Sequence, residues 1–332
     1  MKYKYLIPAS TKIWQGRIDD EENYEAFRWH QWVQNIDLEE MKIPLKGPLN
    51  ICFIGFACDQ GVQRNKGRIG ASSGPESIRR ELANLPCQFK EDVKLFDAGN
   101  LIAKHMTLEN AQADLAGLVE KIISLNMFPI VLGGGHEIAY GHYTGLAKCL
   151  KTDSLGIVNF DAHLDIRPYP NGGSSGTMFR QIFDDCLSSN RKYGYLCLGV
   201  QKRSNTVLLF KDAKKMGAEY IFAKDIVKEL PYHSIDNYVS EFDKLYITIC
   251  SDVFAAAFAP GVSAPQTLGL DPERVLQMLK YLIRTEKVMS FDIAEVSPRF
   301  DHDKVTSNLA SVMIFAVVNA LAKNKGCLIE IE

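Results

Sequence analysis

No uninterrupted apolar run in the 332 residues approaches the length of about 18 that a membrane-spanning helix needs. The first ten residues, MKYKYLIPAS, lack the continuous apolar core of a signal peptide. Neither sign of charge is in excess, because 38 Lys and Arg balance 40 Asp and Glu for a formal net charge of −2. Such a chain has no general attraction to nucleic acid or to an anionic membrane. We therefore expect a soluble, cytoplasmic protein with neither of those partners.

The eight cysteines include no CxxC pair, and most have apolar neighbours in the sequence. Disulfide scaffolds are short and dense in cysteine, so we expect free, buried thiols. Internal repeats and low-complexity linkers are also absent from the sequence. What is present is an ordinary globular composition, 46% hydrophobic and 23% charged, which allows a substantial core.

Short apolar runs rich in Val, Ile, Leu and Phe recur along the chain, with little polar alternation. They cover 50–56, 93–99, 127–134, 155–161, 194–200, 219–223, 245–253 and 287–296. Such runs are typical of strands buried on both faces, and amphipathic helical segments lie between them. This alternation predicts an α/β fold with a mostly parallel central sheet of about eight strands, either open or closed into a barrel. We expect one domain over 48–332, with residues 1–47 as an N-terminal extension packed on its outside.

Potential metal ligands follow three of the predicted strands. They are His136 in LGGGHE, Asp161, His163 and Asp165 in NFDAHLDIR, and Asp252 in CSD. Ligands gather at the carboxyl ends of parallel strands, and alternate side chains of an extended D-x-H-x-D segment project to one side. Two histidines with several carboxylates suit Mn²⁺, and five ligands exceed what one catalytic ion needs. The pattern predicts two metal ions that share ligands and activate water, although DAHLD could also be a loop with solvated carboxylates.

GGGHE, NFDAHLDIR and the run from Tyr246 through AFAPGVSAP closely resemble the three signature motifs of the ureohydrolase (arginase/agmatinase) superfamily, over about 50–325. The resemblance implies an open three-layer α/β/α fold, a dimanganese centre, a homo-oligomer, and hydrolysis of a C–N bond in a guanidino-like group. The implied ligands of one ion are His136, Asp161 and Asp165, and those of the other are Asp161, His163 and Asp252. In FDIAEVSP, Glu295 matches the acid that holds an amidine-type nitrogen of the substrate, and its alternative reading is an N-cap or salt-bridge partner.

Cys250 departs from the superfamily pattern Ser-x-Asp-x-Asp at 248–252, since it stands where an aspartate would bridge both ions. A thiolate is a soft ligand that suits zinc or iron better than manganese. Cys250 therefore either ligates metal in place of the bridge and weakens the second ion, or marks a site that has lost its metal. It is also compatible with a small buried hydrophobe. Because the other ligands are intact, we favour a working site.

The substrate is indicated by further motifs. No histidine follows D-x-H-x-D before His233, which disfavours arginase, and the segments WQGRID, GVQRNKGRIGASSGPESIR, SSGTMFRQ and APGVSAP resemble formimidoylglutamases of histidine degradation. That resemblance implies the conversion of N-formimidoyl-L-glutamate and water into L-glutamate and formamide. The alternatives are another ureohydrolase acting on a guanidino acid and a metal-poor, non-catalytic relative.

The implied substrate carries two carboxylates, which require cationic or hydrogen-bond donors near the ligand motifs. Arg167, just past Asp165, is placed to receive one carboxylate in a bidentate contact. Further substrate-binding candidates are Arg64, Arg68 and Arg180, with Ser175 and Gly176 in a polar turn. Asp165 is also expected to carry a proton during the reaction.

Overall fold

The computed structural model describes residues 3–10 and 12–330, and it contains one ten-stranded sheet. The strands are β1 (Leu6–Ile7), β2 (Gln34–Asn35), β3 (Leu49–Ala57), β4 (Val93–Ile102), β5 (Phe128–Leu132), β6 (Leu155–Phe160), β7 (Tyr195–Val200), β8 (Glu219–Phe222), β9 (Lys244–Cys250) and β10 (Val288–Ala294). Their order across the sheet is β1-β4-β3-β5-β10-β9-β6-β7-β8, with β2 paired to β4. Strands β3 to β10 are the eight predicted ones, and they pair in parallel, so the mostly parallel sheet is confirmed. Within the described residues the sheet stays open between β1 and β8, which excludes the barrel.

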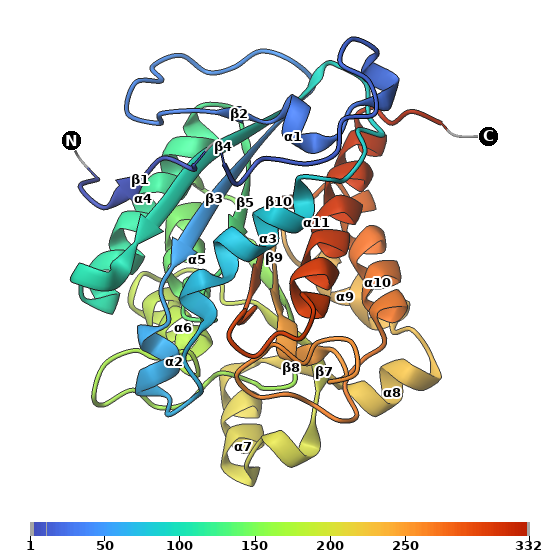
Figure 1. The fold of residues 1–332 in the computed structure, drawn as a ribbon. Helices are drawn as coiled ribbons and strands as arrows, with labels where there is room; N and C mark the ends of the chain where they lie inside the picture. Colours follow the sequence, from blue (N-terminus) through green and yellow to red (C-terminus); the bar gives the residue numbers. More distant parts are fainter. Residues whose placement is uncertain (1–2, 11, 331–332) are drawn as a thin grey trace.

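Helices cover both faces of the sheet (Figure 1). They are α1 (Trp29–Trp32), α2 (Gln60–Arg64), α3 (Gly74–Leu82), α4 (Leu108–Ser124), α5 (Ile138–Cys149), α6 (Met178–Ser188), α7 (Val207–Met216), α8 (Ala223–Lys228), α9 (Tyr232–Ser240), α10 (Pro272–Arg284) and α11 (Val305–Asn324). One core lies under α3 and α8 to α11, and the other lies under α4 to α7. Along β3, Ile51 and Phe53 enter the first core while Cys52 and Ile54 enter the second, as the two-residue period of a strand requires. The predicted three-layer α/β/α fold is confirmed.

Helix α11 is the one described helix long and apolar enough to span a membrane, with a mean hydropathy of 1.8 in its most apolar window. Of that window, 61% is buried inside the protein. Its side chains join those of α3 and α10 in one core, which is the arrangement of a core helix.

The first 47 residues do more than cover the outside of the domain. Strands β1 and β2 both pair with β4, so this segment completes one edge of the sheet. Trp29 is fully buried, and the indole Nε1 of Trp14 donates a hydrogen bond to Asp97 Oδ2 at 2.7 Å. A domain boundary at residue 47 stays a prediction. The eight cysteines are free thiols, as expected, and all but the half-buried Cys149 are buried.

Candidate metal centre

The candidate ligands lie at the carboxyl ends of four neighbouring strands, β5, β10, β9 and β6. His136 follows β5, Asp161 follows β6, Cys250 ends β9, and Asp252 lies in the turn after it. Glu295 follows β10 directly. Because parallel strands all end at the same edge, side chains that are far apart in the sequence meet there.

Asp161 lies between two histidines. Its Oδ2 is 3.0 Å from Nδ1 of His136, and its Oδ1 is 3.4 Å from Nδ1 of His163. Two groups of donors result, each with all its ligand atoms within 4.8 Å of one another: His136, Asp161 and Cys250 in one, and Asp161, His163 and Asp252 in the other. One carboxylate thus serves two groups, which is the arrangement that a pair of metal ions requires.

The three acidic and histidine side chains of the D-x-H-x-D segment converge because the backbone bends after β6. Strand β6 ends at Phe160, so the expectation that extended backbone aligns the three ligands is wrong. Asp161 Oδ1 accepts a hydrogen bond from the backbone N–H of His163 at 2.7 Å, which folds the chain back on itself. Asp165 has a φ of 48°, a left-handed conformation that is rare outside glycine, and its Oδ2 lies 3.2 Å from His136 Nδ1. All three side chains of the motif therefore still face the same centre.

The glycines before His136 let the end of β5 approach neighbouring backbone. A Cβ atom on Gly134 would lie 1.8 Å from the carbonyl oxygen of Cys58, a distance that no side chain could tolerate. The carbonyl of Gly134 also accepts a hydrogen bond from the N–H of Glu295 at 2.8 Å, which ties the ends of β5 and β10 together. The position of His136 therefore depends on this glycine.

Glu295 faces the same centre from a strained backbone, with a φ of 65°. Its Oε1 accepts a hydrogen bond from the N–H of His136 at 3.0 Å, whereas Oε2 is buried without a partner. Burial, with the charge of Glu137 nearby, raises the pKa of Glu295 to about 8. Asp252 Oδ1 is likewise buried and without a partner. Two such oxygens beside the donor groups leave room for a cation and for a ligand N–H, so the residues fit a metal pair.

The carboxylates crowd one another. Burial, followed by the charge of Asp161, raises the pKa of Asp165 to about 6, and burial raises that of Asp252. For His136, burial alone would lower the pKa, but the hydrogen bonds that its ring N–H donates to Asp161 and Asp165 outweigh burial and raise the pKa. Bound cations would relieve this crowding of negative charge.

Behind His136 lies a buried chain of hydrogen bonds that the sequence did not reveal. The other ring nitrogen, Nε2, lies 3.0 Å from Thr248 Oγ1, which in turn donates to Asp292 Oδ1 at 2.6 Å. Tyr246 and His142 both bond the other oxygen of Asp292. With Nε2–H donating to Thr248, Nδ1 of His136 keeps its lone pair for a metal. A signal was present: Asp292 is a lone carboxylate within an apolar strand.

A cavity of about 320 Å³ opens beside these ligands. Arg167 and Ser175 line it, as expected for substrate-binding residues, and so does Arg68, although its guanidinium bonds the carbonyls of Val262 and Ser263. Gly176 acts through its backbone, because its carbonyl accepts the N–H of Arg167 at 2.9 Å. The arginine is thereby held at the wall of the cavity.

Two predicted substrate-binding arginines are engaged elsewhere and do not line this cavity. Arg180 bonds the carbonyl of Ile166 at 2.8 Å and Asp212 Oδ2 at 2.7 Å. Arg64 bonds the carbonyl of Gly173 at 3.0 Å and the carboxylate of Glu109. Both guanidinium groups are satisfied by the protein itself, so the prediction that they bind the substrate is not supported by their positions.

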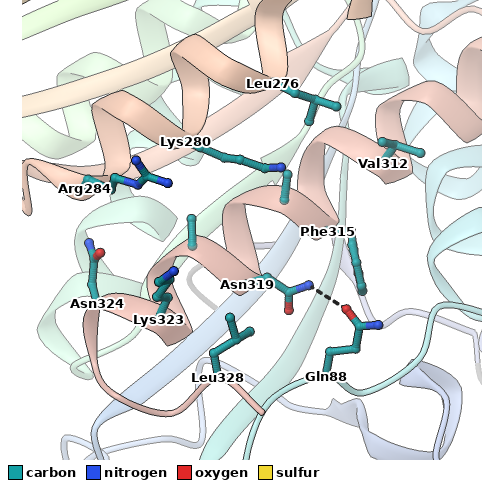
Figure 2. A pocket seen from close by; sticks show the side chains of 12 residues that line it. Gln88, Leu276, Lys280, Arg284, Val312, Phe315, Asn319, Lys323, Asn324 and Leu328 are labelled. Carbon is teal, nitrogen blue, oxygen red and sulfur yellow. Dashed lines mark hydrogen bonds between the residues drawn. The ribbon is translucent and has the colours of Figure 1, made fainter. Parts of the chain in front are cut away.

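A second hollow, of about 410 Å³, lies between α10 and α11 (Figure 2). Lys280, Arg284 and Lys323 lie toward one end of this hollow, and Phe315 lies toward the other end, near Gln88. None of the metal-binding candidates lines it. Of these two cavities, only the smaller one at the strand ends is lined by the metal-binding candidates.

The motifs, the sheet order and the paired donor groups agree with the match of residues 49–319 to the model of the Arginase family, and the chain belongs to that family. A formimidoylglutamase of Clostridium tetani (strain Massachusetts / E88) is 56% identical over 328 residues, which cover 96% of this chain and 97% of the relative. A formimidoylglutamase of Geobacillus sp. (strain WCH70) is 42% identical over 311 residues, 92% of this chain and 94% of the relative. Among solved structures, the Trypanosoma cruzi formiminoglutamase with Mn²⁺₂ superposes with a TM-score of 0.75 at 25% identity, covering 86% of this chain and 98% of that one.

Proposed function

We propose that this protein hydrolyses N-formimidoyl-L-glutamate to L-glutamate and formamide, a step of histidine degradation. The observation that carries the proposal is the position of Asp161, which joins two donor groups whose other members line the same cavity as Arg167. The relatives that match nearly the whole chain bear the name of this activity. A cationic wall suits a substrate with two carboxylates, whereas agmatine, which is positively charged, would be repelled by it.

The proposed cofactor is a pair of divalent ions, of which Mn²⁺ is the one present in the Trypanosoma cruzi structure. Asp161 would touch both ions. His163 and Asp252 would complete one position, and His136, Asp165 and Cys250 the other. When bound, such a pair supplies hydroxide near neutral pH by lowering the pKa of water.

The protein's own residues would bind and orient the substrate. The partnerless Oε2 of Glu295 would accept an N–H of the formimidoyl group, and Arg167 and Ser175 would hold a carboxylate of the glutamate. The water oxygen adds to the formimidoyl carbon, and the bond from that carbon to the glutamate nitrogen breaks. Asp165, beside His136, would carry one proton of the water to the leaving nitrogen, and the second proton, from the hydroxyl of the adduct, would follow as the carbonyl of formamide forms.

The test is hydrolysis by purified protein after loading with Mn²⁺. Formamide and L-glutamate should appear in equal amounts from N-formimidoyl-L-glutamate, with little turnover of L-arginine, agmatine or 4-guanidinobutyrate. Faster turnover of a guanidino compound would move the assignment to another member of the family. Elemental analysis of the same preparation addresses the remaining alternative, because a non-catalytic relative should retain little metal.

We further propose that the protein acts in the cytoplasm as a homo-oligomer, as members of this superfamily commonly do. The resemblance supports this state, and the chain itself does not set the number of subunits. Sedimentation velocity of the metal-loaded protein would measure it. A single species of 37.2 kDa would contradict the proposal.

A further inference from the structure

The two donor groups of the metal centre differ in one element. Asp161, His163 and Asp252 offer only nitrogen and oxygen, whereas His136, Asp161 and Cys250 include a sulfur. Manganese prefers hard oxygen ligands, and thiolate favours softer ions such as Zn²⁺, Fe²⁺ or Co²⁺. The two metal positions therefore differ in the softness of their ligands, even though they share Asp161.

We propose that the two positions select different metals: the position with Cys250 takes a softer divalent ion, and the position with Asp252 takes Mn²⁺. The inference rests on the proposed metal pair, but it does not depend on the substrate. Nitrogen and oxygen sites also bind Zn²⁺ and Co²⁺ more tightly than Mn²⁺. The specific claim is that the sulfur of Cys250 increases the preference for a softer ion over Mn²⁺, and does so only at the position to which Cys250 belongs.

The position of Cys250 supports a ligand role. It ends β9 between the ends of β10 and β6, it is only 2% exposed, and it lines the cavity together with His136 and Asp252. Buried oxygens without partners, Asp252 Oδ1 and Glu295 Oε2, lie among the lining residues of the same cavity. A metal–sulfur bond would form as the thiol proton leaves to solvent.

The other cysteines nearby do not offer the same chemistry. The thiol of Cys197 lies 3.3 Å from the carbonyl oxygen of His163 and 3.8 Å from that of Asp161, so it contacts backbone. Cys58 is as buried as Cys250, at 2% exposure, but belongs to neither donor group. Among the described cysteines, Cys250 alone joins a donor group, and Cys58 is a matched control for burial.

The experiment titrates metal-free protein with Co²⁺ and records its absorption spectrum without substrate. A cobalt–thiolate bond gives a near-ultraviolet charge-transfer band. The band should reach its full height with the first equivalent of Co²⁺ and should persist when Mn²⁺ is then added. Elemental analysis of that sample should find both metals. Cys58→Ser should keep the band, and Cys250→Ser should lose it.

Cys250→Asp provides a second variant, in which a carboxylate replaces the thiol. It should bind two ions without the band and should lose the one-to-one ratio of cobalt to manganese. Absence of the band in wild-type protein that has bound Co²⁺, or its survival in Cys250→Ser, would overturn the inference. A protein that shows the band but releases no formamide would instead contradict the proposed substrate alone.

Discussion

Nδ1 of His142 lies 2.5 Å from Oδ2 of Asp292, and both side chains are fully buried. The same oxygen accepts a hydrogen bond from Tyr246, and the other oxygen accepts one from Thr248. A carboxylate held on both oxygens cannot turn away, so it keeps the hydroxyl of Thr248 oriented toward it. That hydroxyl is then an acceptor for Nε2–H of His136. The tautomer of a proposed metal ligand is thus set two residues away from the metal.

Thr248→Val should weaken metal binding by about 10- to 100-fold, the usual cost of removing the group that orients a metal-binding histidine. Valine has the shape of threonine but cannot accept a hydrogen bond from Nε2–H of His136. Thr248→Ser keeps the hydroxyl and is the matched control. Competition with a chelator, together with circular dichroism to verify folding, measures the effect. Equal affinities for the two variants would show that the hydroxyl does not matter.

Arg167→Gln should raise KM for N-formimidoyl-L-glutamate by about tenfold to a hundredfold, since hydrogen bonds to charged groups contribute roughly 1.5–3 kcal/mol. The effect on kcat should be smaller, because a carboxylate remote from the reacting carbon is held throughout the reaction. Arg180→Gln removes an arginine that bonds Asp212, and it should leave KM near the wild-type value. Comparable rises in KM for both variants would contradict the proposed role of Arg167.

Glu295→Gln should change how the stability of the metal-free protein depends on pH. The pKa of Glu295 rises from an ordinary 4.5 to about 8, so the folded protein holds a proton that the unfolded chain has lost between these values. The free energy of unfolding must then fall as pH rises through that window, by up to about 1.4 kcal/mol per pH unit. Glutamine does not titrate, so the free energy of unfolding of the variant should not fall in this way between pH 4.5 and pH 8.

Urea unfolding in the presence of a chelator, at pH 4.5 and pH 8, measures the effect. The variant should match wild type at the lower pH and exceed it in stability at the higher one. The same substitution should greatly reduce hydrolysis by the metal-loaded protein, since the amide offers a weaker acceptor to the formimidoyl N–H. Parallel stability profiles would show that Glu295 does not hold a proton in this window.

Arg79→Met should lower the free energy of unfolding by about 3–5 kcal/mol. The guanidinium pairs with both oxygens of Asp97, at 2.7 and 2.8 Å, and neither side chain is exposed. Methionine would leave the aspartate buried without its counter-charge. Replacing both residues, as Arg79→Met with Asp97→Asn, should recover part of the loss, because asparagine removes the buried charge and its amide oxygen can still accept the hydrogen bond from Trp14 Nε1. Chemical denaturation gives the values.

The neighbouring residue provides the control. Arg80 pairs with Glu76 on the surface, where both side chains are half exposed, so Arg80→Met should change stability by no more than about 1 kcal/mol. Similar losses for the two arginines would contradict the argument from burial.

Seven of the eight predicted strands were predictable because they are largely buried on both faces and so read as continuous apolar runs, whereas the edge strand β8 is short and only partly buried. The three ligand motifs followed from the rule that parallel strands end at one edge, and the structure places His136, Asp161 and Asp252 there. The partners of long side chains were not predictable. Arg180 is bound by Asp212, 32 residues away, and the role of Asp292 depends on His142, 150 residues before it. Such pairings are set by tertiary packing, which no local pattern records.

The place of β10 in the sheet has a consequence for biosynthesis. This strand is made last, yet it lies between β5 and β9, where it pairs with both. A chain still emerging from the ribosome therefore has two open strand edges in the middle of its sheet, and they stay open until 288–294 has been translated. Glu295, which follows β10, reaches the candidate metal centre only then, so the proposed ions would meet their complete site only when translation is nearly finished.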